Sequence, residues 1–164
     1  MYGPNANTVF ECHNASDNEE FKIGKITLKA LHTPGHTLES ITYLLIDENG
    51  KNHAIFTGDT LFLGDVGRPD LAIKSNLTEK DLAGMLFKSL RTKIMTLEDS
   101  VIIYPAHGAG SACGKNLSKE TVGTLGDQKK NNYALRANMN KDEFVKEVLD
   151  GIGEPPQYFS ENAK

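Results

Sequence analysis

The stretch FTGDTLFLGDVGRPDL (residues 56–71) starts at the end of an apolar, β-like run and places Asp59 in the turn just beyond it. Two other segments have the same layout: LHTPGH places His36, and IYPAH places His107, directly after an apolar run. Strands that end together form a fixed rim, and the loops beyond such ends are where sites are built. The repeated layout therefore predicts that His36, Asp59 and His107 share one rim of a sheet.

The residue types at these positions indicate metal binding. Imidazole and carboxylate groups are ligands that suit zinc or ferrous iron. Taken singly, a histidine after a strand is usually a surface residue, and an aspartate after glycine is usually a turn former. Three such residues in equivalent places favour a shared metal site over three unrelated turns.

The apolar pattern predicts strands at residues 25–31, 40–46, 53–58 and 101–104, with 40–58 forming a hairpin. Helices are predicted at residues 78–90 and 140–153, because each range opens with a capping-box pattern. Residues 118–135 are expected to form two short helical pieces broken near Gly126. This order of elements predicts an α/β fold with helices on a mixed sheet.

Composition narrows the possible functions. A chain of 164 residues with 38% hydrophobic residues suits one domain with a core, and a net charge of −4 does not favour nucleic acid. No apolar run approaches the length of a membrane span, so we expect no membrane insertion. The N-terminal residues lack a signal-peptide layout and only two cysteines are present, Cys12 and Cys113, so a reducing cytoplasm is expected.

The motifs TPGHT, FTGDTLF and YPAHG, in this order, resemble the metallo-β-lactamase superfamily. The longer strings FTGDTLFLGDVGRPDL and YPAHGAGSACGK resemble its persulfide dioxygenases (sulfur dioxygenases), particularly the bacterial type fused to rhodanese domains. The resemblance covers nearly the whole chain. It implies an αββα sandwich and a non-haem iron enzyme that oxidises a low-molecular-weight persulfide, such as glutathione persulfide, with O₂ to sulfite.

One hallmark of the superfamily is missing. The motif HxHxDH should precede the others, yet the sequence contains no His-x-His. The resemblance thus implies an incomplete sandwich, in which residues 1–153 are the C-terminal larger part of the domain. Residues 154–164 would be a tail or linker toward an absent downstream module. On this view the chain alone is metal-free or binds metal weakly, and lacks activity.

The same loss predicts an exposed sheet face. The runs at 40–46 and 101–104 are apolar on both faces, which suits burial on both sides. Without one covering layer, a large apolar face stays exposed. We therefore expect a homo-oligomer, or association with the missing N-terminal half.

The resemblance also implies roles for individual residues. His36 matches the second histidine and Asp59 the aspartate of a triad that holds Fe(II), with zinc as the alternative ion. His107 matches the histidine that binds a second metal in the dinuclear hydrolases, and that stays near the site without ligating in the dioxygenases.

Four further residues are candidates for contact with the substrate or for orienting the site. Arg68 could orient the site or grip a substrate carboxylate, and pairing with Asp65 or Asp70 is an equally weighted alternative. Tyr104 and Lys115 flank the third loop. For Cys113, the favoured interpretation is a small buried or loop thiol. Contact with the substrate sulfur is the alternative.

Two other functions stay open. A thioester hydrolase like glyoxalase II would use two metal ions and a bridging hydroxide, but its segment reads GHTxGH where this chain has Ser40 at the second histidine. The chain could also be a non-catalytic fragment that lacks a complete metal site.

Overall fold

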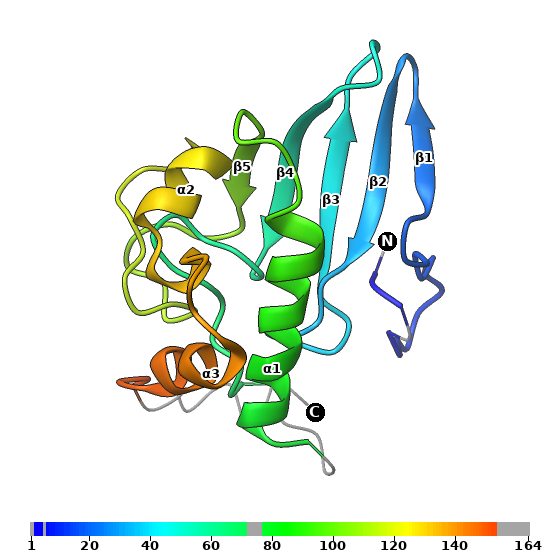
Figure 1. Cartoon of the computed structure of the whole chain (residues 1–164). Coiled ribbons are helices and arrows are strands. Elements are labelled where there is room, and N and C mark those ends of the chain that lie inside the picture. Colours follow the sequence, from blue (N-terminus) through cyan, green and yellow to red (C-terminus); the bar gives the residue numbers. More distant parts are fainter. Residues whose placement is uncertain (1, 5, 72–76, 154–164) are drawn as a thin grey trace.

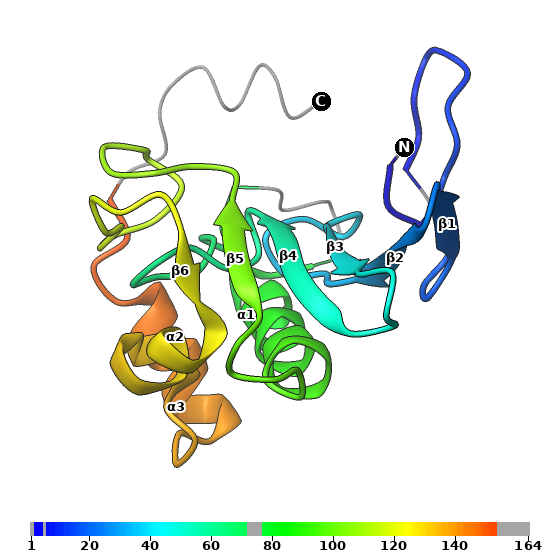
Figure 2. The same cartoon turned by 90° about the horizontal axis from the view of Figure 1, so that it is seen from above.

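The computed structural model describes residues 2–4, 6–71 and 77–153. Six strands form one sheet in the order in which they occur in the chain. Figure 1 shows the sheet, and Figure 2 shows its last strand at one edge. The strands are β1 (Glu20–Ile23), β2 (Ile26–His32), β3 (Ile41–Ile46), β4 (Asn52–Gly58), β5 (Ile102–Pro105) and β6 (Gly123–Thr124). The tail predicted at residues 154–164 lies outside the described residues.

The sheet is mixed, as predicted. Strands β1 to β4 pair antiparallel, β5 runs parallel to β4, and β6 returns antiparallel to β5. The four predicted strands are present, with ends that differ by one residue. The sequence did not predict β1 or β6, because both are short: β1 has four residues and β6 has two.

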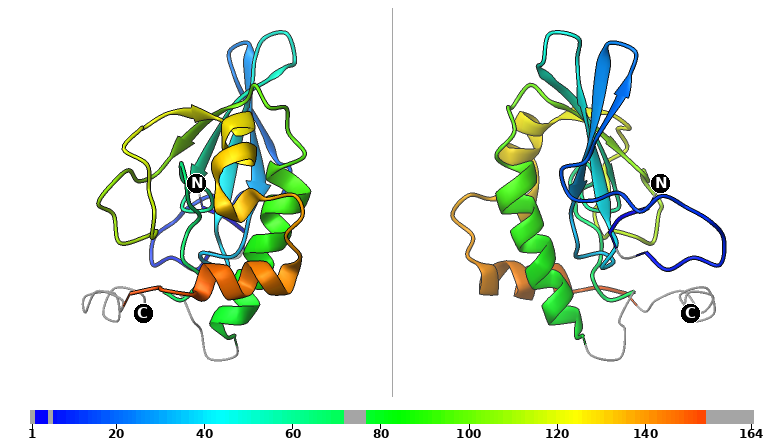
Figure 3. Two further views of the ribbon diagram at one scale, coloured as in Figure 1. Left: turned by 60° about the vertical axis from the view of Figure 1, so that its left-hand side comes forward. Right: turned by 90° about the vertical axis from the view of Figure 1, so that its right-hand side faces the viewer.

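Three α-helices cover one face of the sheet, whereas the other face carries none among the described residues (Figures 2 and 3). They are α1 (Glu79–Ser89), α2 (Leu125–Asn131) and α3 (Lys141–Leu149), joined by a π-helical turn, Leu90–Ile94, and a 3₁₀ turn, Tyr133–Leu135. None of the described helices is long and apolar enough to cross a membrane.

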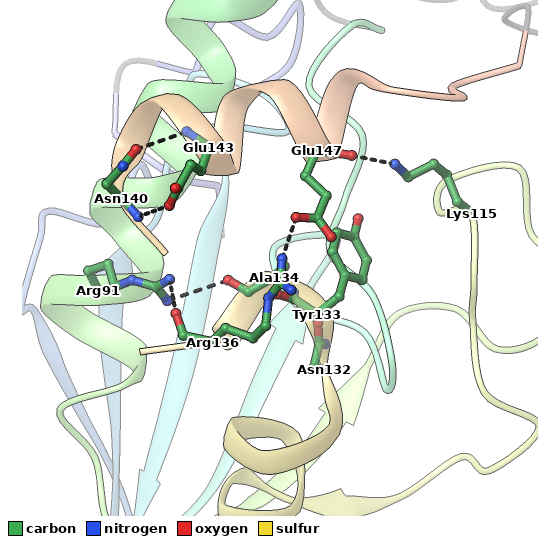
Figure 4. Close-up of polar contacts among 9 residues, drawn as sticks. All are labelled: Arg91, Lys115, Asn132, Tyr133, Ala134, Arg136, Asn140, Glu143 and Glu147. Atoms are coloured by element: carbon green, nitrogen blue, oxygen red, sulfur yellow. Dashed lines mark hydrogen bonds and ion pairs between the residues drawn. The ribbon is translucent and has the colours of Figure 1, made fainter. Parts of the chain in front are cut away.

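Both predicted capping boxes are present. Thr78 accepts a hydrogen bond from the Asp81 N–H at the start of α1, while the Asp81 carboxylate accepts from the Thr78 N–H. Asn140 and Glu143 make the same reciprocal pair at the start of α3 (Figure 4). These local bonds satisfy N–H groups that the first helical turn leaves without partners, so the helices begin where the sequence predicts.

The predicted break near Gly126 is wrong. Helix α2 runs through Gly126, Thr124 caps its start, and the helix ends at Asn132. A Cβ atom on Gly126 would lie 2.8 Å from the Cβ of Asp99. The glycine therefore allows close packing against a neighbouring loop and does not interrupt the helix.

The two faces of the sheet differ sharply in burial. Leu44, Ile55 and Ile103 are direct neighbours across β3, β4 and β5, and they are buried in one core with Leu86 of α1. On the opposite face, Phe56 and Tyr104 are neighbours in register and remain 42% and 38% exposed.

The rings of Phe56 and Tyr104 stack on each other, with their centroids 5.4 Å apart. An apolar, partly exposed surface thus lies opposite the helices. The expectation that this surface associates with another chain stays a prediction.

Candidate metal centre

The strand directions bring three loops to one edge of the sheet. Because β2 and β4 are both antiparallel to β3, they run the same way, and β5 runs parallel to β4. The loops after β2, β4 and β5 carry His36, Asp59 and His107. His36 Nε2 lies 3.5 Å from Asp59 Oδ2, and His107 Nε2 lies 3.1 Å from Asp59 Oδ1.

The Asp59 carboxylate lies between the two imidazoles, and one of its oxygens lacks a hydrogen-bond donor among the described residues. Its Oδ1 atom is buried and has no hydrogen-bond partner among the described residues. The 3.1 Å approach of His107 is close but does not have hydrogen-bond geometry. A buried carboxylate oxygen without a donor is costly. A cation beside Oδ1 would remove that cost, so the site fits a metal ion.

His36 is held in the tautomer that a metal needs. Its Nδ1 lies 2.8 Å from the backbone carbonyl of Arg68. Since a carbonyl can only accept, Nδ1 carries the proton and Nε2 keeps its lone pair. That lone pair is on the side of the ring near Asp59. A second nitrogen fixed in this way is typical of histidines that ligate metals.

Gly67 allows the three loops to come together. A Cβ atom on Gly67 would lie 1.8 Å from the backbone oxygen of Asp59 and 3.2 Å from the Cβ of His36. No other residue fits between these ligands without moving them. Gly67 was not among the predicted site residues, although its place in the string GDVGRPD was an available signal.

Helix α1 supports the loop that carries His36. Gly35 has φ +150°, and a Cβ atom there would lie 2.4 Å from the Cβ of Leu86. The Ser89 hydroxyl donates to the carbonyl of Pro34, over 2.8 Å. The loop therefore rests directly on a packed helix.

Cys113 lies close to two of these ligands. Its sulfur, a carboxylate oxygen of Asp59 and a ring nitrogen of His107 are all within 4.8 Å of one another. The side chain is buried, with 9% of the residue exposed. This position is in keeping with both alternatives for Cys113, a buried thiol and a group near the reacting centre.

Arg68 is buried, and its guanidinium makes four hydrogen bonds within the described part of the chain. Its guanidinium makes two hydrogen bonds to the Asp70 carboxylate, at 2.8 Å and 2.7 Å. It also donates to the carbonyls of Ala112 and Gly153. The Asp70 hydrogen bonds, opposed by burial, raise the pKa of Arg68 above its ordinary value. The sequence left two roles open for Arg68: binding of a substrate carboxylate, or pairing with Asp65 or Asp70. The structure has the pairing with Asp70, so the guanidinium is already bonded to a carboxylate of the chain.

Lys115 also has structural partners. Its ammonium donates to the backbone carbonyls of Glu147 and Asp150 at the end of α3, at 2.7 Å and 2.6 Å (Figure 4 shows the Glu147 bond). A cation at a helix C-terminus is stabilised by the exposed carbonyls and the helix dipole. Lys115 thus joins the third loop to α3. Tyr104, on the open face of the sheet, contacts Phe56.

Asp65 organises the third loop, and the sequence analysis gave it no such role. Its Oδ2 accepts from the backbone N–H groups of Lys115 and Asn116. Its Oδ1 accepts from the Tyr133 hydroxyl at 2.8 Å. Burial, together with the Asp65 charge, raises the pKa of Tyr133, so the phenol keeps the proton it donates. A carboxylate inside GDVGRPD was the only local signal.

Comparison with solved structures identifies the architecture. No family model matches the sequence. A metallo-β-lactamase from Staphylococcus aureus subsp. aureus COL superposes with a TM-score of 0.80 at 38% identity, over 92% of this chain and 43% of that chain. The chain has a metallo-β-lactamase fold. Six strands and three helices among the described residues are consistent with an incomplete form of it.

Two further similarities bear on the superfamily. ETHE1 from Myxococcus xanthus superposes with a TM-score of 0.68 at 26% identity, over 92% of this chain and 56% of that chain. A hydroxyacylglutathione hydrolase of Dictyostelium discoideum is 36% identical over 93 residues, which are 56% of this chain and 31% of that protein. These matches support the metallo-β-lactamase superfamily and a metal-binding enzyme family.

The matches cover only part of each relative. This chain spans between 31% and 42% of the length of the curated relatives it matches. The activity of a whole relative is therefore a proposal for this chain and is treated as one below.

Proposed function

We propose that this chain provides part of the active site of a non-haem iron persulfide dioxygenase. The reaction would convert a low-molecular-weight persulfide (RSSH), O₂ and water into the thiol (RSH) and sulfite. The observation that carries the proposal is the Asp59 carboxylate, which lies between two imidazoles and has a buried Oδ1 without a donor among the described residues. The resemblance of GDVGRPDL to the dioxygenases, and the likeness to ETHE1 from Myxococcus xanthus, support this branch.

Two residues of the chain would hold the metal in this reaction. His36, through Nε2, and Asp59 would be two members of a facial triad of two histidines and one carboxylate. The other histidine belongs to the HxHxDH motif that this sequence does not contain. A bound ferrous ion would supply open positions for the persulfide sulfur and for O₂. Arg68 would keep the proton on His36 Nδ1 through its carbonyl.

The hollow beside Arg68 and Lys115 is the proposed binding place for the thiol part of the substrate. Both line a hollow of about 300 Å³ with Ala112, Gly114 and residues 151–153. That volume is at the small end of ligand pockets. The Asp70 carboxylate balances the charge of Arg68, whereas Lys115 bonds only to neutral carbonyls. Lys115 would therefore supply the positive charge that favours an anionic thiol such as glutathione persulfide.

One observation favours a glyoxalase II-like hydrolase as the second candidate. The two oxygens of Asp59 face different histidines, which is the arrangement of a carboxylate that bridges two metal ions. Relatives named hydroxyacylglutathione hydrolases add to it. Against it, Ser40 replaces a histidine of that family. The Ser40 hydroxyl accepts from the Thr37 N–H at 3.0 Å, so it closes its own loop.

Metal stoichiometry and turnover together test these candidates. The purified chain would be titrated anaerobically with Fe(II) and with Zn(II), then assayed for O₂ uptake with glutathione persulfide and for hydrolysis of a glutathione thioester. One iron per chain with persulfide-dependent O₂ uptake supports the dioxygenase. Two zinc ions with thioester hydrolysis overturn it in favour of the hydrolase. Metal binding without either activity supports the non-catalytic fragment.

A further inference from the structure

We propose that Cys113 is a metal ligand, which together with Asp59 and His107 binds a divalent ion through sulfur, oxygen and nitrogen. This inference rests on the metal centre proposed above, with which it shares Asp59, but it places the ion on the His107 side of that carboxylate. It does not depend on which reaction the centre performs. It makes this chain able to hold a metal ion with its own residues, contrary to the expectation that the chain alone binds metal weakly or not at all.

The ligand atoms lie close to the spacing that one ion requires, so a small shift of the side chains would bring them onto it. Zinc binds sulfur, nitrogen and oxygen at about 2.0–2.3 Å, so two ligand atoms of one ion lie no more than roughly 4.6 Å apart. The ligand atoms of Asp59, His107 and Cys113 all lie within 4.8 Å of one another, and the Asp59–His107 pair is at 3.1 Å. Among the described residues, this is the one group of three histidine, cysteine or carboxylate side chains whose ligand atoms lie this close together.

The backbone holds Cys113 in place from two sides. Its N–H donates to the Ser111 hydroxyl, and its carbonyl accepts from the Arg68 N–H, both at 3.1 Å. The next residue, Gly114, has no room for a side chain, because a Cβ atom would lie 2.3 Å from Leu117 Cδ1. These contacts fix the backbone position from which the Cys113 thiol extends.

The unsatisfied oxygen of Asp59 belongs to this side of the carboxylate. Oδ1 is the atom without a hydrogen-bond partner, and it is also the atom that approaches His107. Oδ2 approaches His36 instead. An ion bound by Oδ1, His107 and Cys113 would satisfy the orphaned oxygen directly. His36 would lie on the other side of the carboxylate, outside this group of ligands.

A thiolate in the ligand set determines the preferred ion. Thiolates select zinc and its cobalt substitute over magnesium or calcium, which prefer oxygen ligands. We therefore expect the chain alone to bind Zn(II) or Co(II) at one site and to bind Mg(II) poorly. The site would be four-coordinate when one water or substrate atom completes it.

Cobalt spectroscopy tests the ligand directly. Co(II) added anaerobically to the wild-type chain should produce a thiolate-to-cobalt charge-transfer band in the near ultraviolet. Cys113→Ser should abolish the band and weaken Zn(II) binding at least about tenfold, since losing even an outer partner of a ligand costs that much. Cys12→Ser is the matched control. Cys12 is the other cysteine, it contacts Thr8 and Asn14 in the N-terminal loop, and its loss should change neither.

A second measurement uses only the wild-type chain, so it stays informative even if the Cys113→Ser variant does not fold. Saturating Zn(II) should protect Cys113 from alkylation by iodoacetamide and leave Cys12 reactive, as read by mass spectrometry of the peptides. The inference is wrong if the charge-transfer band survives in Cys113→Ser, or if Zn(II) does not protect Cys113. Co(II) binding could also be abolished by His36→Ala and left unchanged by Cys113→Ser. That result would overturn the inference but would leave the proposed metal centre in place. No binding of any of these ions would overturn both.

Discussion

His36 donates a hydrogen bond of 2.8 Å from its Nδ1 to the backbone carbonyl of Arg68. The N–H of the same residue, Arg68, donates to the carbonyl of Cys113 over 3.1 Å. The backbone at position 68 therefore connects the loop after β2 with the loop after β5. The guanidinium reinforces the link, because it bonds to Asp70 and to the carbonyl of Ala112. Arg68 is a positioning residue on this evidence.

Removing the Arg68 side chain should loosen both loops. Arg68 and Asp70 have side-chain exposures of 7% and 14%, and breaking a buried pair at one partner costs about 3–5 kcal/mol. We expect Arg68→Met to lower the free energy of unfolding by an amount in this range, measured by urea denaturation. The double variant Arg68→Met/Asp70→Leu should regain most of the loss, because no charge is left unpaired. Equal losses in the single and double variants would contradict the argument.

Gly67→Ala should damage the metal site through sterics alone. The new methyl group would overlap the backbone oxygen of Asp59, at 1.8 Å, so the loop must move. We expect a stability loss of about 1–3 kcal/mol, as for other overpacked sites, and weaker Zn(II) binding in calorimetric titration. Gly108→Ala is the control, since a Cβ atom there meets nothing within 4 Å. Similar effects at both glycines would show that the close approach at Gly67 is unimportant.

Asp59→Asn should separate stability from metal binding. The substitution removes the charge of a half-buried carboxylate whose buried Oδ1 has no donor among the described residues. The metal-free variant should gain about 1 kcal/mol of stability, on the scale of one unsatisfied polar atom, seen as a higher melting temperature. Zn(II) affinity should fall at least about tenfold. A less stable metal-free variant would mean that Asp59 has a structural partner we have not identified.

The capping box of α1 should make stability depend on acid pH. Hydrogen bonds from the Thr78 hydroxyl and N–H hold the pKa of Asp81 below its ordinary value of 3.8. A carboxyl with a lowered folded-state pKa stabilises the fold above its ordinary pKa, and that contribution is lost as pH falls through the lowered value. Thermal melts from neutral pH to below 3.8 should therefore show a shallower acid decline for Asp81→Asn than for wild type. An identical decline would exclude a contribution from Asp81.

The exposed sheet face should make the chain associate with a second copy of itself. Phe56 and Tyr104 stack on each other at the surface and Ile23 is 56% exposed, so apolar area stays in water. Each 100 Å² of such area that becomes buried contributes about 2.5 kcal/mol. Sedimentation velocity over a range of micromolar concentrations should show a concentration-dependent dimer. Phe56→Ser/Tyr104→Ser should shift it toward monomer, and a monomeric wild type would refute the prediction.

Local signals in the sequence determined where the elements and the ligand loops lie. The apolar runs predicted β2 to β5 within one residue, and the capping boxes predicted the starts of α1 and α3. The placement of His36, Asp59 and His107 just beyond strand ends predicted loops at one edge. These features depend on residues a few positions apart, so a sequence pattern can carry them.

Contacts between distant residues were decided only by the tertiary structure. Cys113 approaches Asp59 because β4 and β5 are parallel neighbours and because Asp65 bonds to the loop after β5, which carries Cys113. The roles of Gly67 and Gly126 depend on an atom from another loop that comes within 3 Å. Strands β1 and β6 exist because a partner strand supplies their hydrogen bonds. Such relationships combine register, strand order and packing, and no local pattern of residue types encodes all three.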